Sequence, residues 1–200
     1  MTIESQTMYS EVAALHASSM DRGFLPSLGE GFLALLYEAI DSSEDAILII
    51  EHSEGRVQGF VAGASSLGDI YKSLLRRPIR LILTLCPLIL NLRKVWRIIE
   101  LLMHTLWSAQ QSSELGESAL PPFELISISV SPNMRRSGVA HRLYDKLKEA
   151  ARSRGFDSFK IIVGEELTGA HKFYTRMGAL PVSETSVHGG KVSLVYVQGC

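Results

Sequence analysis

Apolar and polar residues follow two different periodicities along this chain, and their succession predicts its elements. In the first third, apolar residues recur at helical spacing over 8–20 and over 32–40. Two short apolar runs, 46–50 and 57–64, follow these helices, and polar turn residues at 52–55 lie between the runs. The first third therefore predicts two helices followed by two strands joined as a hairpin.

The middle of the chain, about 67–121, has a helical pattern and no strand pattern. Three helical pieces are expected within 71–75, 79–90 and 95–106, with prolines between and inside them. The longest uncharged apolar run, 81–92, is much shorter than the roughly 20 residues that a membrane span needs. We therefore expect a helical insertion and no transmembrane helix.

The last third returns to short elements. Its apolar pattern predicts a strand, a helix, a strand, a helix and two strands, in that order, over 123–130, 139–151, 159–163, 168–177, 182–187 and 192–197. Gly155 and Gly178 are placed to end the two helices, and Thr168 is placed to cap the second. Together the three parts predict one α/β (α+β) domain over 1–200 that carries the insertion.

Size and charge exclude several classes of protein. A chain of 200 residues forms one generous domain, and a hydrophobic content of 46% is enough to build its core. Twenty Lys and Arg residues against 21 Asp and Glu residues give a formal net charge of −1, so no global basic field indicates a nucleic-acid partner.

Residues that bind metals or form disulfides are few and scattered. Cys86 and Cys200 are too few and too scattered for a disulfide framework or a metal site, and the six histidines show no metal-ligand spacing, so no metal is expected. The first residues lack the basic and apolar regions of a secretory signal. These observations predict a cytoplasmic protein.

The segment 124–154 contains the most informative pattern, a strand, a loop and an amphipathic helix. Gly138 and Ala140 put small residues at the start of that helix, where up to four backbone N–H groups lack intrahelical partners. The helix dipole favours negative charge there, and Arg135 and Arg136 add positive charge beside it. The pattern fits a pyrophosphate cradle, although taken alone it also fits an ordinary loop before a helix.

Two sequence motifs resemble those of the GNAT superfamily of N-acetyltransferases. Val130-Ser131-Pro132 followed by 135–140 resembles motif A, and 170–179, with its Phe173-Tyr174 pair, resembles motif B. The resemblance implies a GNAT fold, in which helices flank a mixed, mostly antiparallel sheet. It also implies direct transfer of an acetyl group from acetyl-CoA to a primary amine. Two positions depart from the motifs, with Leu167 where many members carry Asn and Ala179 where Phe is usual.

The resemblance also implies roles for individual residues. The end of the strand, Ile128, Ser129 and Val130, would pair with the pantetheine arm of acetyl-CoA, and Tyr174 would protonate the departing thiolate. Glu124 is the candidate base for the amine. The pyrophosphate would be held by the residues of the cradle, which are Arg135, Arg136, Ser137, Gly138, Val139, Ala140 and His141. Two structural alternatives stay open: Tyr174 could simply pack on its helix, and Glu124 could lie at an exposed strand start.

The sequence of the insertion does not identify the amine that accepts the acetyl group. Between Asp69 and Glu100 the basic residues outnumber the acidic ones, so this part could bind an anionic acceptor such as a nucleotide-linked amino sugar. It could instead cover the sheet, form a homodimer face, or make peripheral membrane contact through 70–100. The insertion, together with the stretch 23–37, resembles GNAT proteins associated with bacterial surface-polysaccharide synthesis, which favours an amino sugar among small-molecule amine acceptors. Acetylation of a protein or peptide N-terminus, and a non-catalytic CoA-binding or membrane-docking module, are the alternative functions.

Overall fold

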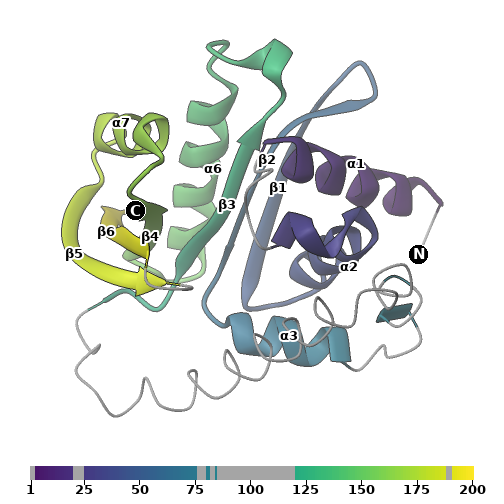
Figure 1. Cartoon of the computed structure of the whole chain (residues 1–200), viewed down its shortest axis with the longest axis horizontal. Helices are drawn as coiled ribbons and strands as arrows, with labels where there is room; N and C mark the ends of the chain where they lie inside the picture. Colours follow the sequence, from purple (N-terminus) through teal and green to yellow (C-terminus); the bar gives the residue numbers. More distant parts are fainter. Residues whose placement is uncertain (1–2, 20–24, 76–79, 82–83, 85–119, 188–190) are drawn as a thin grey trace.

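One six-stranded sheet, in the order β1-β2-β3-β4-β6-β5, organises the computed structural model (Figure 1). The structure describes residues 3–19, 25–75, 80–81, 84, 120–187 and 191–200. The strands are β1 Ala46–Ser53, β2 Arg56–Ala64, β3 Glu124–Val130, β4 Ser158–Gly164, β5 Leu180–Val187 and β6 Lys191–Gly199. Among the strands that the structure describes, only β3 and β4 pair in parallel, so the sheet is mixed and mostly antiparallel, as predicted.

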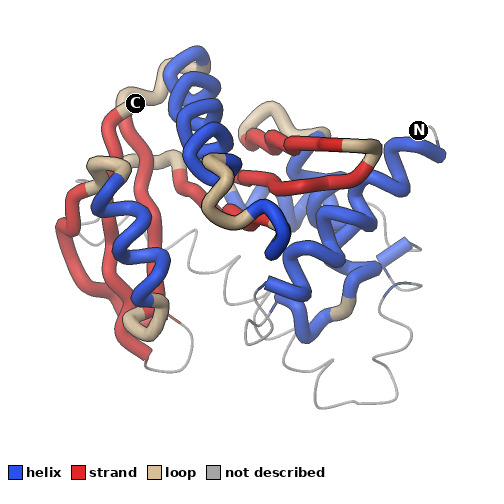
Figure 2. Tube along the Cα trace, turned by 90° about the horizontal axis from the view of Figure 1, so that it is seen from above, coloured by secondary structure: helices blue, strands red, loops and turns tan. Residues whose placement is uncertain are grey.

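Helices cover both faces of this sheet (Figure 2). They are α1 Ile3–Ser19, α2 Glu30–Asp41, α3 Leu67–Leu75, α6 Val139–Ser153 and α7 Thr168–Arg176, with short 3-10 turns η1 Leu25–Leu28 and η3 Pro132–Met134. One buried cluster packs α1, α2 and α3 against the sheet, and a second cluster packs α6 and α7 against it. We refer to the two sides as the α1/α2 face and the α6/α7 face.

The sheet opens between β3 and β4. These two strands pair only at their first residues, Glu124 with Lys160 and Leu125 with Ile161, and then separate. Figure 1 shows β3 running up beside α6 while β4, β5 and β6 form a group to one side. The backbone of β3 beyond Leu125 therefore has no strand beside it on the β4 side within the described part of the chain.

A bulge in β3 decides which side chains meet each face. Ala62 lies opposite Ser127 but the next residue of β2, Gly63, lies opposite Leu125, so Ile126 is left without a partner. Beyond the bulge, Ile128 and Val130 pack against the cluster of the α6/α7 face. Ser127 and Ser129 consequently alternate to the α1/α2 face, where Ser127 is hydrogen-bonded to Tyr37 of α2.

A glycine in β2 brings the start of α6 close to the sheet. A Cβ atom at Gly59 would lie 2.9 Å from Leu143 and 3.0 Å from Val139, both of which are fully buried residues of α6. Any larger residue would push away the helix whose first turn forms the predicted cradle. Gly59 therefore helps to set the depth of that cradle.

Most predicted elements are confirmed with small shifts of their ends, and one detail is wrong. Thr168 is the first residue of α7 rather than its cap, because the cap position is taken by Leu167, which makes no capping hydrogen bond through its side chain. Gly155 and Gly178 follow α6 and α7 with φ of 84° and 88°, as expected of glycines that end helices.

The predicted insertion is described only in part. Helix α3 begins at Leu67, but most of 76–119 lies outside the described residues, as do most of the proposed membrane-contact and dimer segments. Two of the basic residues that could bind an anionic acceptor are described, and each has an acidic partner. Lys72 contacts Asp69 and Arg80 contacts Glu38, both at 2.9 Å. Within the described residues, no helix is long and apolar enough to cross a membrane.

Candidate active site

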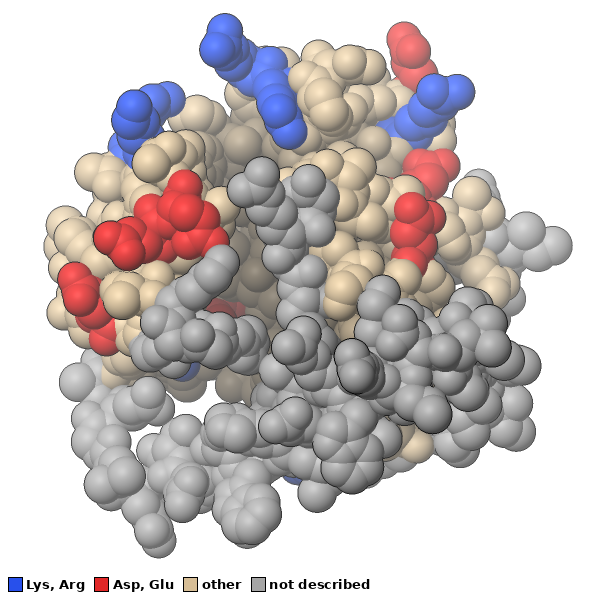
Figure 3. All heavy atoms as spheres, in the orientation of Figure 1, with Lys and Arg blue, Asp and Glu red and all other residues tan. Residues whose placement is uncertain are grey.

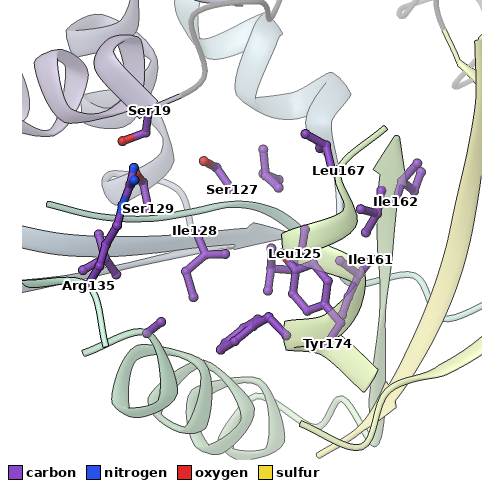
Figure 4. A pocket seen from close by; sticks show the side chains of 16 residues that line it. Ser19, Leu125, Ser127, Ile128, Ser129, Arg135, Ile161, Ile162, Leu167 and Tyr174 are labelled. Atoms are coloured by element: carbon purple, nitrogen blue, oxygen red, sulfur yellow. The ribbon is translucent and has the colours of Figure 1, made fainter. Parts of the chain in front are cut away.

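A cavity of about 390 Å³ occupies the opening between β3 and β4 (Figure 4). One wall is β3 from Leu125 to Val130, the opposite wall is β4, and α7 closes the narrow end with Tyr174. Within the described part of the chain, its lining consists of Ser19, Leu125, Ile126, Ser127, Ile128, Ser129, Val130, Arg135, Ala140, Ile161, Ile162, Val163, Leu167, Ala170, Phe173 and Tyr174. The cavity is elongated along β3 and mostly apolar.

Tyr174 is almost completely buried, with 6% of its surface exposed. Its ring lies among the rings of Phe173, Tyr144 and Tyr196, at centroid distances of 5.4, 6.0 and 6.4 Å. Burial raises the pKa of the Tyr174 hydroxyl well above its ordinary value. The hydroxyl therefore stays protonated at neutral pH, which is the state that a proton donor needs.

Glu124 lies at the apex of the opening, where β3 and β4 still pair. Burial raises the pKa of its carboxyl, and the ammonium group of Lys160, 3.8 Å away, partly opposes this shift. The carboxylate is close enough to Tyr71 of α3 to raise the pKa of that hydroxyl, an effect second to burial. Glu124 is thus directed to the side of the sheet that α3 covers, and its side chain is not part of the cavity lining.

The loop before α6 forms the predicted cradle. Arg136 and Gly138 have φ of 64° and 83°, and this left-handed backbone turns the chain sharply into the helix. The first helical hydrogen bond runs from the N–H of Arg142 to the carbonyl of Gly138 at 3.1 Å. The amides of Val139, Ala140 and His141 therefore precede the helical ladder and are available to an anion.

A second cavity, of about 420 Å³, adjoins the first at this loop. It shares Val130, Arg135, Ala140 and Phe173 with the first cavity, and its basic lining is Arg135, Arg136, His141 and Arg176. Lys and Arg side chains gather at the corresponding upper end of the molecule in Figure 3, where β3 ends and α6 begins. The two cavities together form a channel with a basic outer end and an apolar inner end.

Three of the predicted cofactor-binding residues can offer only some of their groups to a ligand. Ser137 directs both its N–H and its hydroxyl to the carbonyl of Met134, at 3.3 and 2.5 Å, and lines neither cavity. The side chain of Val139 is buried in the core, which leaves only its backbone for a ligand. Ser129 lines the cavity from the α1/α2 face, opposite to Ile128 and Val130.

His171, which we considered as a residue of the acceptor pocket, is held elsewhere. Its Nδ1 lies 2.9 Å from the Tyr196 hydroxyl and its Nε2 lies 3.0 Å from the carbonyl of Gly164. Both ring nitrogens are therefore engaged, and His171 does not line the cavity that contains Tyr174.

The structure adds residues that sequence reasoning missed. Ser127 and Ser19 reach the same cavity, from β3 and from the end of α1, and Arg176 joins the basic end from α7. Arg176 follows Tyr174 within motif B, so its helical spacing offered a signal. No pattern in the sequence linked Ser19 to a strand more than a hundred residues later.

Comparisons with known proteins agree with this geometry. The sequence model of the acetyltransferase (GNAT) family matches residues 106–179. An aminoglycoside 6'-acetyltransferase type Ii is similar in structure, with a TM-score of 0.59 and 11% identity, covering 96% of this chain and 90% of that one. An aminoglycoside 6'-N-acetyltransferase complexed with coenzyme A gives a TM-score of 0.58 at 11% identity, over 96% and 89%.

A third solved structure, described as an acetyltransferase, gives a TM-score of 0.56 at 19% identity and covers 97% of this chain and 95% of that one. No curated protein matches the chain. At these identities the structural similarity establishes the fold, and that fold is the one predicted from the two motifs.

Proposed function

The chain carries a GNAT acetyltransferase domain, and from this premise we propose that it transfers the acetyl group of acetyl-CoA directly to the primary amine of a small molecule. In this proposal Tyr174 is the general acid and Glu124 is the general base. Ile128, Ser129 and Val130 border the path of the pantetheine arm, and the amides of 138–141 bind the pyrophosphate. A cytoplasmic location is part of the proposal.

The fit of acetyl-CoA to these residues rests on two features of the channel. The edge of β3 beyond Leu125 faces the cavity rather than another strand, so its backbone groups are available to the amides of an extended arm. The outer end combines free helix amides with Arg135, Arg136 and Arg176, which suits a pyrophosphate. The apolar inner end suits a thioester.

Two residues near the apex, Tyr174 and Glu124, then carry out the two proton transfers. Acetyl-CoA supplies an activated acetyl thioester. Tyr174 holds its proton until negative charge develops on sulfur and then donates it, because burial keeps the hydroxyl neutral. Glu124, whose pKa is raised, takes the proton of the amine directly or through water from the α1/α2 face. The apolar walls keep bulk water from the site.

One observation carries the proposal: the opening between β3 and β4 has a buried tyrosine at its closed end and a basic helix N-terminus at its open end. The acid and the anion site lie at opposite ends of one channel, as a long phosphorylated thioester requires. A pocket that only stabilised the fold would need neither feature.

Calorimetric titration of the purified chain with acetyl-CoA is the test. We expect micromolar binding, and weaker binding of 3'-dephospho-CoA if the basic end reaches the 3'-phosphate. A panel of primary amines, followed by release of the CoA thiol, then tests transfer. Transfer to peptide N-termini but not to small amines would favour the protein acetyltransferase alternative. Binding without transfer to any amine would favour a non-catalytic module.

A further inference from the structure

Three serine residues line the cavity on the side away from α6 and α7. Ser127 and Ser129 come from β3, and Ser19 is the last residue of α1 (Figure 4). Ser127 and Ser129 are 3% and 6% exposed. The hydroxyls of Ser19 and Ser129 are buried and have no hydrogen-bond partner among the described residues.

Buried hydroxyls without partners are unusual in a folded protein. Most buried polar side-chain atoms are hydrogen-bonded, because an unpaired one has lost its hydrogen bonds to water and gained none in the protein. Here two of them border the same cavity as Tyr174. A ligand that brings its own donor and acceptor to this wall would satisfy both.

Ser127 differs from these two serines because its hydroxyl is hydrogen-bonded to a residue of α2, on the side away from the cavity. Its hydroxyl bonds to Tyr37, and the Tyr37 hydroxyl in turn bonds to Nδ1 of His16. Burial lowers the pKa of His16 to about 4, so the imidazole is neutral and can accept the proton of Tyr37. Tyr37 then accepts from Ser127, whose oxygen is left as an acceptor toward the cavity. An amine N–H is the complementary donor.

The charge of the cavity lining further restricts the chemical class of the ligand. Of the described residues that line the cavity, Arg135 is the only charged one, and none is acidic. In Figure 4 the Arg135 side chain extends along the same wall as Ser129 and Ser19. A ligand with several ammonium groups would find no counter-charge there, whereas neutral hydroxyls would find partners.

We propose that Ser19, Ser127 and Ser129 form the acceptor subsite, and that the acceptor is a monoamine with a hydroxyl group close to its reacting nitrogen. Ser127 accepts a hydrogen bond from the amine and orients it, and Ser129 and Ser19 bind the hydroxyl. Residues two apart on one strand face are separated by about 7 Å. One sugar ring with its substituents spans that distance. This inference rests on the proposed function and names its substrate class.

Matched amines test the subsite. The acceptors are trans-2-aminocyclohexanol and cyclohexylamine, which differ by one hydroxyl, with glucosamine and the polycationic kanamycin as further probes. We expect wild-type kcat/KM to favour the amino alcohol over cyclohexylamine by about tenfold, since one buried hydrogen bond is lost with the hydroxyl. Ser129→Ala should reduce this preference to about twofold, because the hydroxyl of the amino alcohol then loses a hydrogen-bond partner that cyclohexylamine never uses. Ser19→Ala should weaken the preference in the same direction.

Ser153→Ala is the matched control, because Ser153 is exposed on α6, away from the cavity, and its hydroxyl donates to the carbonyl of Ala150 in its own helix. It should keep the full preference. Equal rates for the two matched amines, a preference that survives in Ser129→Ala, or faster transfer to kanamycin than to glucosamine would each overturn the subsite.

Acetyl-CoA affinity, measured on the same samples, distinguishes a failure of the acceptor subsite from a failure of the proposed function. If acetyl-CoA binds but neither matched amine is acetylated, the subsite is wrong and the cofactor channel stands. If acetyl-CoA does not bind, the proposed function fails and the subsite fails with it.

Discussion

The two faces of the sheet meet the candidate active-site cavity in different ways. On the α6/α7 face, the candidate contacts come mainly from backbone: the open edge of β3 and the first amides of α6. On the α1/α2 face they come from side chains, the three serines and the Tyr37–His16 pair behind Ser127. The first face suits a ligand common to many enzymes, and the second suits a ligand particular to this one.

This difference follows from what each kind of contact depends on. Backbone amides at a helix start are present whatever the side chains are, provided that small residues let the ligand approach. A side-chain site instead changes with every substitution. The α6/α7 face can therefore be shared across distant relatives, while in our proposal the α1/α2 face determines which amine is accepted.

The largest expected effect comes from a substitution at the start of α6, on the side of the cavity proposed to bind acetyl-CoA. Gly138→Asp puts a carboxylate beside the helix amides, and we expect acetyl-CoA affinity to fall on the order of 1,000-fold, since several charge-assisted hydrogen bonds are lost. Calorimetric titration measures it. Gly138→Ala is the control, because it imposes a similar strain at φ 83° without the charge. Retained binding in Gly138→Asp would remove the cradle from the proposal.

The second effect separates binding from chemistry on the same face. Tyr174→Phe should lower kcat roughly 100-fold, the ordinary contribution of a general acid, with little change in acetyl-CoA affinity. Tyr144→Phe is a matched control, because Tyr144 is a neighbouring buried tyrosine whose hydroxyl bonds to Gln198 at 3.0 Å instead of reaching the cavity. Equal kcat in wild type and Tyr174→Phe would exclude the acid role.

The third effect addresses the side of the sheet that α3 covers. Glu124→Gln should lower kcat/KM about 30-fold at neutral pH, because water can replace part of the base. In the wild type the base form exists above the raised pKa of Glu124, so activity should fall as pH drops, with a midpoint above 4.5. This fall in activity at low pH should be absent in Glu124→Gln. Lys160→Met should move it to higher pH, since the ammonium group of Lys160 lowers the pKa of Glu124.

The smallest effect concerns the stability of the α1/α2 face. The pKa of His16 is about 4 in the folded chain, against 6.5 in an unfolded one, so the unfolded state binds more protons between these values. The free energy of unfolding should therefore decrease as pH falls through this window, by about 1 kcal/mol between pH 6.5 and 5.5. Urea unfolding at both pH values measures it. His16→Asn should show a smaller decrease, and an identical decrease would place the proton uptake elsewhere.

Sequence patterns recovered the elements of the fold and the cofactor motifs to a large extent. Each of these features is local: a strand or helix follows from the periodicity of about ten residues, and the cradle follows from the six residues 135–140. Tyr174 was predicted for the same reason, from a short helix motif. The roles assigned to the cradle residues, Tyr174 and Glu124 stay predictions until the variants above are measured.

The features that the sequence did not reveal are those that depend on pairing over long distances. Strand β3 has a recognisable pattern, but nothing in it shows that β4 leaves it after Leu125 or that a bulge at Ile126 turns Ser127 toward Tyr37. Likewise, His16 and Tyr37 are ordinary members of amphipathic helices until packing brings them together.

The sequence by itself therefore determined the class of fold, the order of its elements and the cradle with its tyrosine, because local periodicity and contiguous motifs encode them. The tertiary structure alone decided the opening of the sheet, the faces that Glu124, Ser127 and Ser129 meet, and the place of Ser19 beside them. These depend on strand register and helix packing, which are set by contacts among residues far apart in the chain.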